Sequence, residues 1–438
     1  MSVGRGIIER MFDTLVDVDS DAREAALVAR IAELERVKSA AAAEQAKATA
    51  EFDAIRRARE AAAGVPAAKR GKGLASEIAL ARRDSPNRGG RHLGFARALV
   101  HEMPYTLAAL ESGALSEWRA TLIVRESACL DVEDRRLLDA ELCADQAGLE
   151  GLGDARIAAA AKTIAYRLDS QAVVDRAAHA ENERTVSIRP APDTMTYVTA
   201  LLPMTQGVSV YAALKRAADT CGDGRGRGQV MADTLVERVT GRPADVPMPI
   251  AVNLVITDET LLAGDNSPAN VSGYGPIPAA VACRLASGAV TDERSKATLR
   301  RLYKQPASGA LVAIESKSRL FPKGLARFIS TRDDTCRTPY CDAPIRHTDH
   351  ADPHNRGGPT NDANGLGACE ACTYAKEAPG WRVRSWRDDA GRHIAEFTTP
   401  TGARHRSKAP PLLGEPSAEQ ASGIEVGVAN KLAHQHAA

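Results

Sequence analysis

The sequence predicts a mostly helical α+β protein, and three observations support this fold class. Alanine is abundant and aromatic residues make up 4% of the chain, which favours helices over a β-sandwich or barrel. Apolar residues recur at three- and four-residue spacing through 93–182, as in amphipathic helices. Shorter segments that alternate between apolar and polar residues follow, as in strands. Because 438 residues exceed what one hydrophobic core usually organises, we expect several domains.

The first expected domain, residues 1–66, is a helical, coiled-coil-like segment with one long helix over 20–63. Ser20 is a suitable N-cap, and the glycine and proline after residue 63 end the helical pattern. An apolar seam with a seven-residue repeat, interrupted in its middle, runs along the helix: Leu27, Ile31, Leu34, Phe52 and Ile55. This seam favours self-association or a partner helix. The alternative is an amphipathic helix that lies on its own domain.

Residues 67–318 form the second expected domain, which combines helices with a small α+β part. The stretch 66–92 mixes basic residues with Gly, Pro and Ser, so we expect a solvated linker, with an arm that contacts nucleic acid as the alternative. Six helices are expected after it, at 93–102, 105–112, 116–128, 132–147, 154–167 and 170–182. Strands at 184–189, 195–202 and 250–257 and helices at 207–219 and 229–240 complete the domain.

Four of the eight cysteines lie in one short segment and have the spacing of metal ligands. Cys336 and Cys341 are separated by four residues, and Cys369 and Cys372 by two. Each pair lets two thiolates reach one ion, and two pairs complete a tetrahedral zinc site. We therefore expect structural Zn²⁺, whose binding would supply much of the folding energy of a segment poor in large apolar residues.

The residues between the two cysteine pairs suggest chemistry on a phosphate. Asp349 offers a hard oxygen ligand of the kind that Mg²⁺ or Mn²⁺ prefers. His350 follows directly, and a histidine of ordinary pKa can take a proton from water at neutral pH. Cleavage of a phosphodiester needs an activated water and positive charge to offset the charge that develops on oxygen. The segment offers both, because His350 can activate a water and Asp349 can bind a divalent cation.

Two blocks of the second domain resemble a bacterial family of unknown function. RALVHEMPYTLAALESGALSEWRATLIVRE (97–126) is similar to the family's Pro-, Gly- and Ser-containing helical signature, and VVDRAAHAENERTVSIRPAPDTMTYVTALLP (173–203) resembles its next block. The family is the domain-of-unknown-function family 222 (DUF222). It has no settled biochemical role, but the resemblance implies a frequent companion, a C-terminal HNH module.

Residues 319–380 resemble the zinc-containing form of the HNH (ββα-metal) endonucleases. The resemblance implies that Asp349 binds the catalytic ion, that His350 is the general base and that Asn364 braces the loop between two strands and so aims the histidine. Further positions match the family pattern: the loop turn at Gly357, Gly358 and Pro359, the helix-opening pair Cys369 and Cys372, Lys376 facing the phosphate, and His354 as support or substrate contact.

One position departs from the HNH pattern. The residue after Cys372 should be a histidine or asparagine that completes metal coordination, and here it is Thr373, a weak and short ligand. The first hypothesis is a metal-dependent DNA endonuclease. The second is a catalytically weakened, zinc-folded protein that binds nucleic acid, and the third is a helical interaction or assembly protein.

The end of the chain predicts a β-hairpin over 381–412 and a disordered tail over 413–438. The segment WRVRSWR (381–387) alternates as a strand does, so the hairpin either packs its tryptophans on the nuclease module or presents an edge with Arg382, Arg384 and Arg387 to DNA. Exposed arginines such as Arg337 are expected to face solvent or to touch phosphates.

Composition limits the partners and the location of the protein. The net charge is +1, so contact with DNA must come from local basic patches. No apolar run is long enough to cross a bilayer, and charged residues interrupt the N-terminus, so we expect a cytoplasmic protein with no membrane contact.

Overall fold

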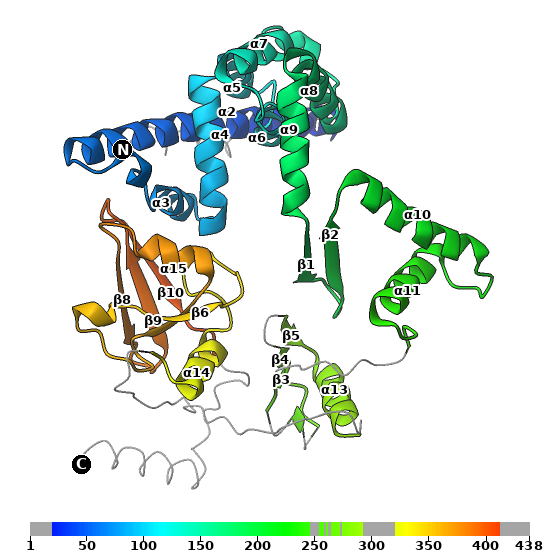
Figure 1. The fold of residues 1–438 in the computed structure, drawn as a ribbon, viewed down its shortest axis with the longest axis vertical. Coiled ribbons are helices and arrows are strands. Elements are labelled where there is room, and N and C mark those ends of the chain that lie inside the picture. The colour runs from blue at the N-terminus through cyan, green and yellow to red at the C-terminus, as the bar shows by residue number, and fades with distance from the viewer. Residues whose placement is uncertain are drawn as a thin grey trace. The chain divides into compact units, whose positions relative to one another are not determined.

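The computed structural model describes residues 20–245, 254–257, 260–261, 264–271, 274–291 and 320–411. The chain divides into two compact units (Figure 1). The first comprises residues 1–78 and 90–178, and the second comprises residues 79–89 and 179–438. Helices predominate and all the described sheets are small and antiparallel, which confirms the predicted α+β class.

The first unit is a bundle of helices whose positions the apolar spacing predicted closely. Its long helices are α2 (Ser20–Ala62), α4 (Gly89–His101), α5 (Pro104–Ser112), α6 (Glu117–Glu126), α7 (Val132–Cys143), α8 (Asp154–Leu168) and α9 (Ser170–Ala180). One apolar cluster joins them, and Leu99, Leu110, Ile123, Leu138 and Ile157 are among its fully buried members. A core of this kind is the main stabilising contribution of a helical bundle.

The two halves of helix α2 have different surroundings. Ala42, Ala43, Ala46 and Ala50 of the second half are buried in the helical core, where their small side chains let α5 approach closely. In the first half, the seam residues Leu27, Ile31 and Leu34 are exposed. The helix therefore lies on its own domain over one half, and its seam remains available over the other.

The predicted linker over 66–92 is wrong in part. Helix α3 (Leu74–Ala81) lies within it, and the short 3-10 helices η1 (Ala67–Lys69) and η2 (Pro86–Arg88) flank this helix. Leu74 and Ile78 are buried with Leu93 in a separate small cluster. Their i, i+4 spacing is helical, but the glycines and basic residues around them obscured the pattern.

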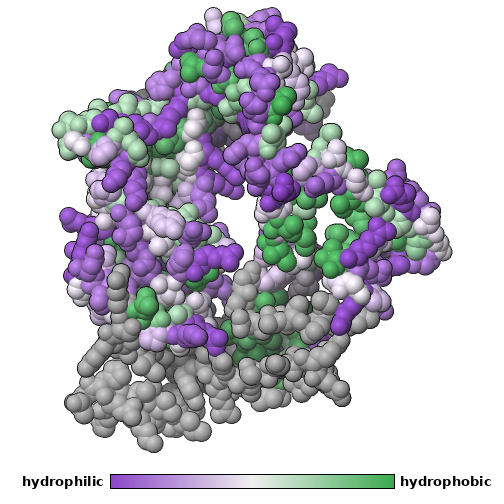
Figure 2. Space-filling view, in the orientation of Figure 1, coloured by the Kyte–Doolittle hydropathy of each residue, from purple (hydrophilic) through white to green (hydrophobic). Residues whose placement is uncertain are grey.

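The second unit begins with a hairpin and two helices that have little apolar cover. Strands β1 (Thr185–Pro190) and β2 (Thr196–Leu201) pair antiparallel, and helices α10 (Met204–Thr220) and α11 (Arg227–Thr240) follow. Both faces of the hairpin are exposed, so apolar side chains such as Ile188 and Val198 lie on the surface. Figure 2 shows green, hydrophobic atoms over this part of the molecule. The predicted strands and helices are confirmed here.

A second small sheet follows in the chain. Strands β3 (Leu254–Val255), β4 (Ala269–Val271) and β5 (Gly275–Ile277) pair antiparallel in that order, and helix α13 (Ala279–Thr291) follows. Ala269, Ile277 and Ala282 are buried together between the sheet and the helix. Of the predicted strand 250–257, positions 250–253 lie outside the described residues.

The C-terminal module, residues 321–411, contains the helix–hairpin–helix core and a second sheet. Its core elements are α14 (Lys323–Asp333), β6 (His347–His350), the 3-10 helix η5 (His354–Arg356), β7 (Gly365–Ala368) and α15 (Glu370–Lys376). The second sheet contains β8 (Arg382–Arg387), β9 (His393–Thr398) and β10 (Arg404–Lys408), in the order β10-β9-β8. The predicted hairpin is therefore a three-stranded sheet, and the predicted tail lies outside the described residues.

None of the helices that the structure describes combines the length and the apolar character needed to span a bilayer.

Candidate functional site

The four predicted cysteine ligands come together in one buried cluster. Their Sγ atoms all lie within 4.8 Å of one another. The Sγ atom of Cys341 lies 3.9 Å from that of Cys369 and 3.7 Å from that of Cys372. Around a tetrahedral ion, ligand bonds of about 2.3 Å separate the sulfur atoms by about 3.8 Å. The cluster therefore can hold a metal ion such as zinc.

The acidity of the thiols shows why a cation suits this cluster. Hydrogen bonds from Cys341 and Cys372 lower the pKa of the Cys336 thiol to about 2. The contact with Cys336 raises the pKa of Cys341 to about 12, and the contacts with both raise the pKa of Cys372, because each further thiolate would face a negative charge. Ionisation of all the thiols therefore requires a positive ion among them.

Strands β6 and β7 connect the predicted catalytic residues to the cysteine cluster. Asp349 pairs with Leu366 and His350 with Gly365 at the start of β7, and β7 then leads to the second cysteine pair. A Cβ atom on Gly365 would lie 2.3 Å from Ile329 of α14. The absence of a side chain at this position lets α14 pack tightly on the hairpin.

Asn364 spans the loop that connects the two strands. Its Oδ1 accepts a hydrogen bond from the amide of Asp352 at 2.9 Å, and its Nδ2 donates to the carbonyls of Asp352 and Pro359 at 3.0 and 2.8 Å. A Cβ atom on Gly358 would lie 1.9 Å from the Asp352 carbonyl, so this loop position requires glycine. The Asn364 side chain thus connects the beginning of the loop, at Asp352, to its second half, at Pro359, through hydrogen bonds.

His350 lies under the loop rather than in open solvent. Its side chain is 8% exposed, and its Nε2 atom is hydrogen-bonded to Thr360 Oγ1 at 2.9 Å. The ring centroid lies 4.5 Å from that of Phe321 and 5.7 Å from that of His354, which is exposed. Thr360 was not among the predicted site residues, because a single threonine in a loop gives no sequence signal.

Asp349 is paired with a lysine. Its Oδ1 accepts from the amide of His350 at 2.8 Å, and its Oδ2 lies 2.9 Å from Lys376 Nζ. The same ammonium donates to the His350 carbonyl at 2.9 Å and to Glu377 Oε1 at 3.2 Å. The resemblance implied that Lys376 faces the phosphate, whereas its side chain is 6% exposed and contacts these three oxygens.

The three oxygens around Lys376 define a centre suited to positive charge. Carboxylate and carbonyl oxygens are the ligands that magnesium prefers, so the donor set fits a divalent cation in type. In this structure the Lys376 ammonium supplies that positive charge. The Thr373 hydroxyl donates a hydrogen bond to the Cys369 carbonyl at 3.1 Å within helix α15.

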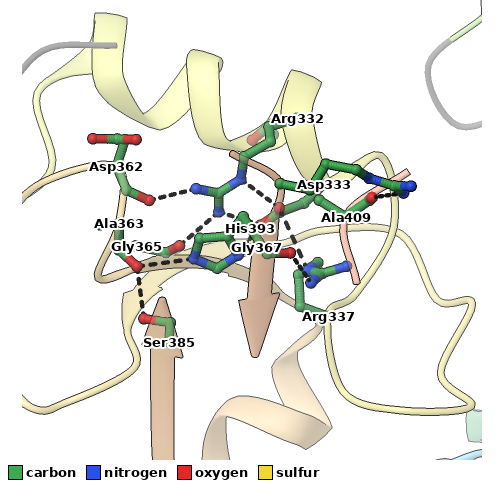
Figure 3. A network of polar contacts seen from close by, with 12 residues as sticks. Arg332, Asp333, Arg337, Asp362, Ala363, Gly365, Gly367, Ser385, His393 and Ala409 are labelled. Carbon is green, nitrogen blue, oxygen red and sulfur yellow. Dashed lines mark hydrogen bonds and ion pairs between the residues drawn. The ribbon is translucent and has the colours of Figure 1, made fainter. Parts of the chain in front are cut away.

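A buried polar network at the end of helix α14 holds the loop in place (Figure 3). Asp333, at the end of α14, accepts hydrogen bonds from Arg332 at 2.7 Å and from the amide of Gly367 at 2.7 Å. Arg332 also donates to the carbonyls of Asp362 and Gly365. Arg337, for which solvent or phosphate was expected, is buried and lies 3.6 Å from Asp333. That expectation is wrong.

Residues of the C-terminal sheet form hydrogen bonds to the same loop. Ser385 Oγ and His393 Nε2 both bond the carbonyl of Ala363, at 2.6 and 2.9 Å (Figure 3). Burial, reinforced by the positive charge of Arg332, lowers the pKa of His393 to about 2, so its ring is neutral. Arg387 forms an ion pair with Asp362, so part of its charge is balanced within the module.

These supporting residues were missed by the sequence reasoning, although α14 carried a signal. Leu325, Ile329, Arg332 and Asp333 follow the i, i+4, i+7, i+8 pattern of one helix face. Two of the four are charged, and charged residues on the apolar face of a short helix indicate a buried ion pair. His393 and Ser385 lacked such a signal, because their role depends on packing between distant segments.

Comparison with known proteins gives one family match. The family model described as a domain of unknown function (DUF222) matches residues 34–333, from within α2 to the end of α14. No curated protein and no solved structure matches the chain. The matched region covers about two thirds of the sequence and contains both blocks on which the resemblance was based. The protein therefore belongs to the DUF222 family.

Proposed function

We propose that this protein is an HNH-type endonuclease that hydrolyses phosphodiester bonds in DNA. The observation that carries the proposal is the thiol cluster joined to a ββα unit, in which β6 carries Asp349 and His350 and its partner strand β7 leads to the second cysteine pair. We further propose that the cluster binds Zn²⁺ and that this ion folds the module without taking part in the reaction. Duplex DNA is the proposed substrate, because the HNH resemblance concerns DNA.

The proposed roles follow from the position of each side chain. Asp349, with Glu377 as a second carboxylate, would hold Mg²⁺ or Mn²⁺. The ion would supply positive charge to offset the charge that develops on the phosphate and the leaving oxygen. His350 would accept the proton of the attacking water, and Asn364 would keep the loop around it in place.

The second candidate function is DNA binding without cleavage. Two contacts favour it: Lys376 already neutralises Asp349, and the Thr373 hydroxyl is engaged by its own helix. Under this hypothesis the module binds DNA with strong salt dependence, but no divalent ion supports cutting.

Plasmid nicking across a panel of metal ions separates the two functions. We expect the native protein to nick with Mg²⁺ or Mn²⁺ and His350→Ala to lose at least about a hundredfold of that rate, since general-base catalysis contributes that much. His347→Ala is the matched control, because His347 is exposed on the same strand. Equal cutting by the His350 variant at unchanged zinc content would refute the catalytic assignment.

Substitution of Thr373 tests whether the third HNH position limits activity. Thr373→His would restore a nitrogen ligand where the HNH pattern has one. If this variant nicks and the native protein does not, the second candidate function holds for the native chain. If both nick at the same rate, the missing ligand is unimportant and the nuclease proposal stands.

A further inference from the structure

The outer face of the C-terminal sheet concentrates positive charge. Alternate side chains of β8, β9 and β10 point to opposite faces of the sheet. Val383, Ala395 and Phe397 on the inner face are buried against Ala351 and Leu366 of the module core. The outer face carries five basic residues and one acid: Arg382, Arg384, Arg404, Arg406, Lys408 and Glu396.

The strand register arranges these charges in rows. Arg382 and Arg404 both lie opposite Thr398, so they form one row across the sheet. Arg384 and Arg406 both lie opposite Glu396 and form the next row. The chain as a whole has a net charge of +1, so this face departs strongly from the average of the molecule.

Part of this charge is balanced within the module. Arg406 forms an ion pair with Glu396 at 2.6 Å, and Lys408 pairs with Asp388. Arg382, Arg384 and Arg404 are exposed, and in the described part of the chain no hydrogen bond or ion pair joins their side chains to another residue. Three guanidinium groups therefore remain to attract an anion.

We infer that this outer face, the basic sheet face, binds the phosphate backbone of duplex DNA. Residues two apart on a strand are about 7 Å apart. Successive phosphates of one DNA strand rise about 3.4 Å along the helix axis and, because the backbone winds around that axis, lie roughly 7 Å apart through space, so this spacing equals one phosphate step. Arginine suits such contacts because its planar guanidinium donates to two phosphate oxygens at once.

The basic sheet face is separate from the loop that follows His350 and contains Ala363. Its strands contact that loop through their inner side, by way of Ser385 and His393. The face is therefore an anchoring surface for DNA and takes no part in the reaction. The inference rests on the proposed DNA substrate, but it can fail or hold independently of cleavage.

Duplex binding at several salt concentrations tests the inference. In the full-length protein, Arg382→Gln, Arg384→Gln and Arg404→Gln are combined, and fluorescence anisotropy measures the affinity for a labelled duplex. Each lost phosphate contact lowers the slope of log K against log salt by about 0.9, so we expect a decrease of about 2.7. Three exposed basic residues of α10 and α11, changed in the same way, form the control: Lys215, Arg216 and Arg238.

A substitution that is expected to strengthen DNA binding excludes misfolding as the explanation for weaker binding. Glu396→Gln removes the acid from the basic sheet face and releases Arg406, so we expect severalfold tighter binding and a steeper salt slope. Damage to the fold would weaken binding instead. Unchanged affinity in both the triple variant and the Glu396 variant would overturn the inference.

Binding and nicking together show which proposal fails. If the native protein nicks DNA and the triple variant binds as tightly as the native protein, the basic sheet face is not the anchor and the nuclease proposal stands. If no metal supports nicking and the triple variant loses its salt-dependent binding, the face is an anchor and the nuclease proposal is wrong.

Discussion

Lys376 and a divalent cation would compete for the same carboxylate. The ammonium lies 2.9 Å from Asp349 Oδ2, so it occupies the region in which a bound ion would contact this oxygen. Competition of this kind would raise the metal concentration that cleavage requires above the concentration that a free carboxylate would need. The lysine side chain, rather than the weak ligand Thr373, then sets the threshold.

Lys376→Met tests this competition. Removal of a positive charge about 4 Å from the ion is worth about 1 to 4 kcal/mol, so we expect Mn²⁺ to bind at least about fivefold more tightly. Electron paramagnetic resonance measures free Mn²⁺ directly, and Lys323→Met, at the start of α14, is the control. Weaker binding in the Lys376 variant would mean that the lysine supports the ion.

His393 gives the module a specific dependence on pH. In the folded state its pKa is about 2, while in the unfolded chain a histidine titrates near 6.5. As the pH falls from 7.5 to 5, this histidine therefore binds a proton in the unfolded state but stays neutral in the folded state. The difference lowers the free energy of unfolding by about 2 kcal/mol. His393→Gln keeps a donor for Ala363 and should lose this component. Denaturation at both pH values measures it, and equal pH dependence in the two proteins would contradict the assignment.

The end of helix α14 stabilises the module through charge rather than through apolar contact. Asp333 receives hydrogen bonds from Arg332 and Gly367 and lies close to Arg337, all in a buried region. Asp333→Ala would leave two guanidinium groups buried without this partner, so we expect a loss of about 3 to 5 kcal/mol.

Fluorescence can follow this loss in the module itself. Two of the three tryptophans, Trp381 and Trp386, lie in the module, and Trp118→Phe removes the third. Asp342→Ala is the control, because Asp342 is exposed in the first cysteine loop. A loss below about 1 kcal/mol for Asp333→Ala would show that the network contributes little.

The exposed first half of helix α2 is suited to pairing with a second copy of the chain. In heptad terms Ile31 takes an a position between Leu27 and Leu34 at d positions, a combination that favours two-stranded parallel coiled coils. We expect the native protein to sediment as a dimer and Leu27→Gln combined with Ile31→Gln to sediment as a monomer. Leu137→Gln, an exposed position on α7, is the control. A monomeric native protein would remove this hypothesis.

The sequence predicted those elements whose pattern is local. Helices α4 to α11 and strands β1 and β2 were found from their periodicity, and the thiol cluster was found from its spacing. Strand β10 was missed because RHRSK has no apolar residue, and its pairing depends on the backbone of β9. The Lys376–Asp349 pair could not be predicted either, since its partners are far apart in sequence.

At the scale of the whole molecule, the two units have different sources of stability. The first has a continuous apolar core, while the C-terminal module has small apolar clusters, a polar network and the thiol cluster. If the cluster holds zinc, removal of the ion should unfold the module and leave the helical unit intact.

Chelation measures this difference directly. With a strong zinc chelator we expect the emission of Trp381 and Trp386 to change, while most of the far-ultraviolet helical signal remains, because the first unit supplies it. Restoring zinc should reverse the change. Complete loss of the helical signal would mean that the two units fold as one.

The bonds from Ser385 and His393 to Ala363 decide where the module may be shortened. A protein that stopped after helix α15 would keep all four thiols. The loop carrying Asn364 would, however, lose both of these hydrogen bonds. The smallest autonomous fragment worth expressing must therefore extend through Ala409, whose carbonyl also receives Arg392. A boundary drawn from the HNH motif would keep the four thiols but leave the loop that Asn364 spans without these contacts.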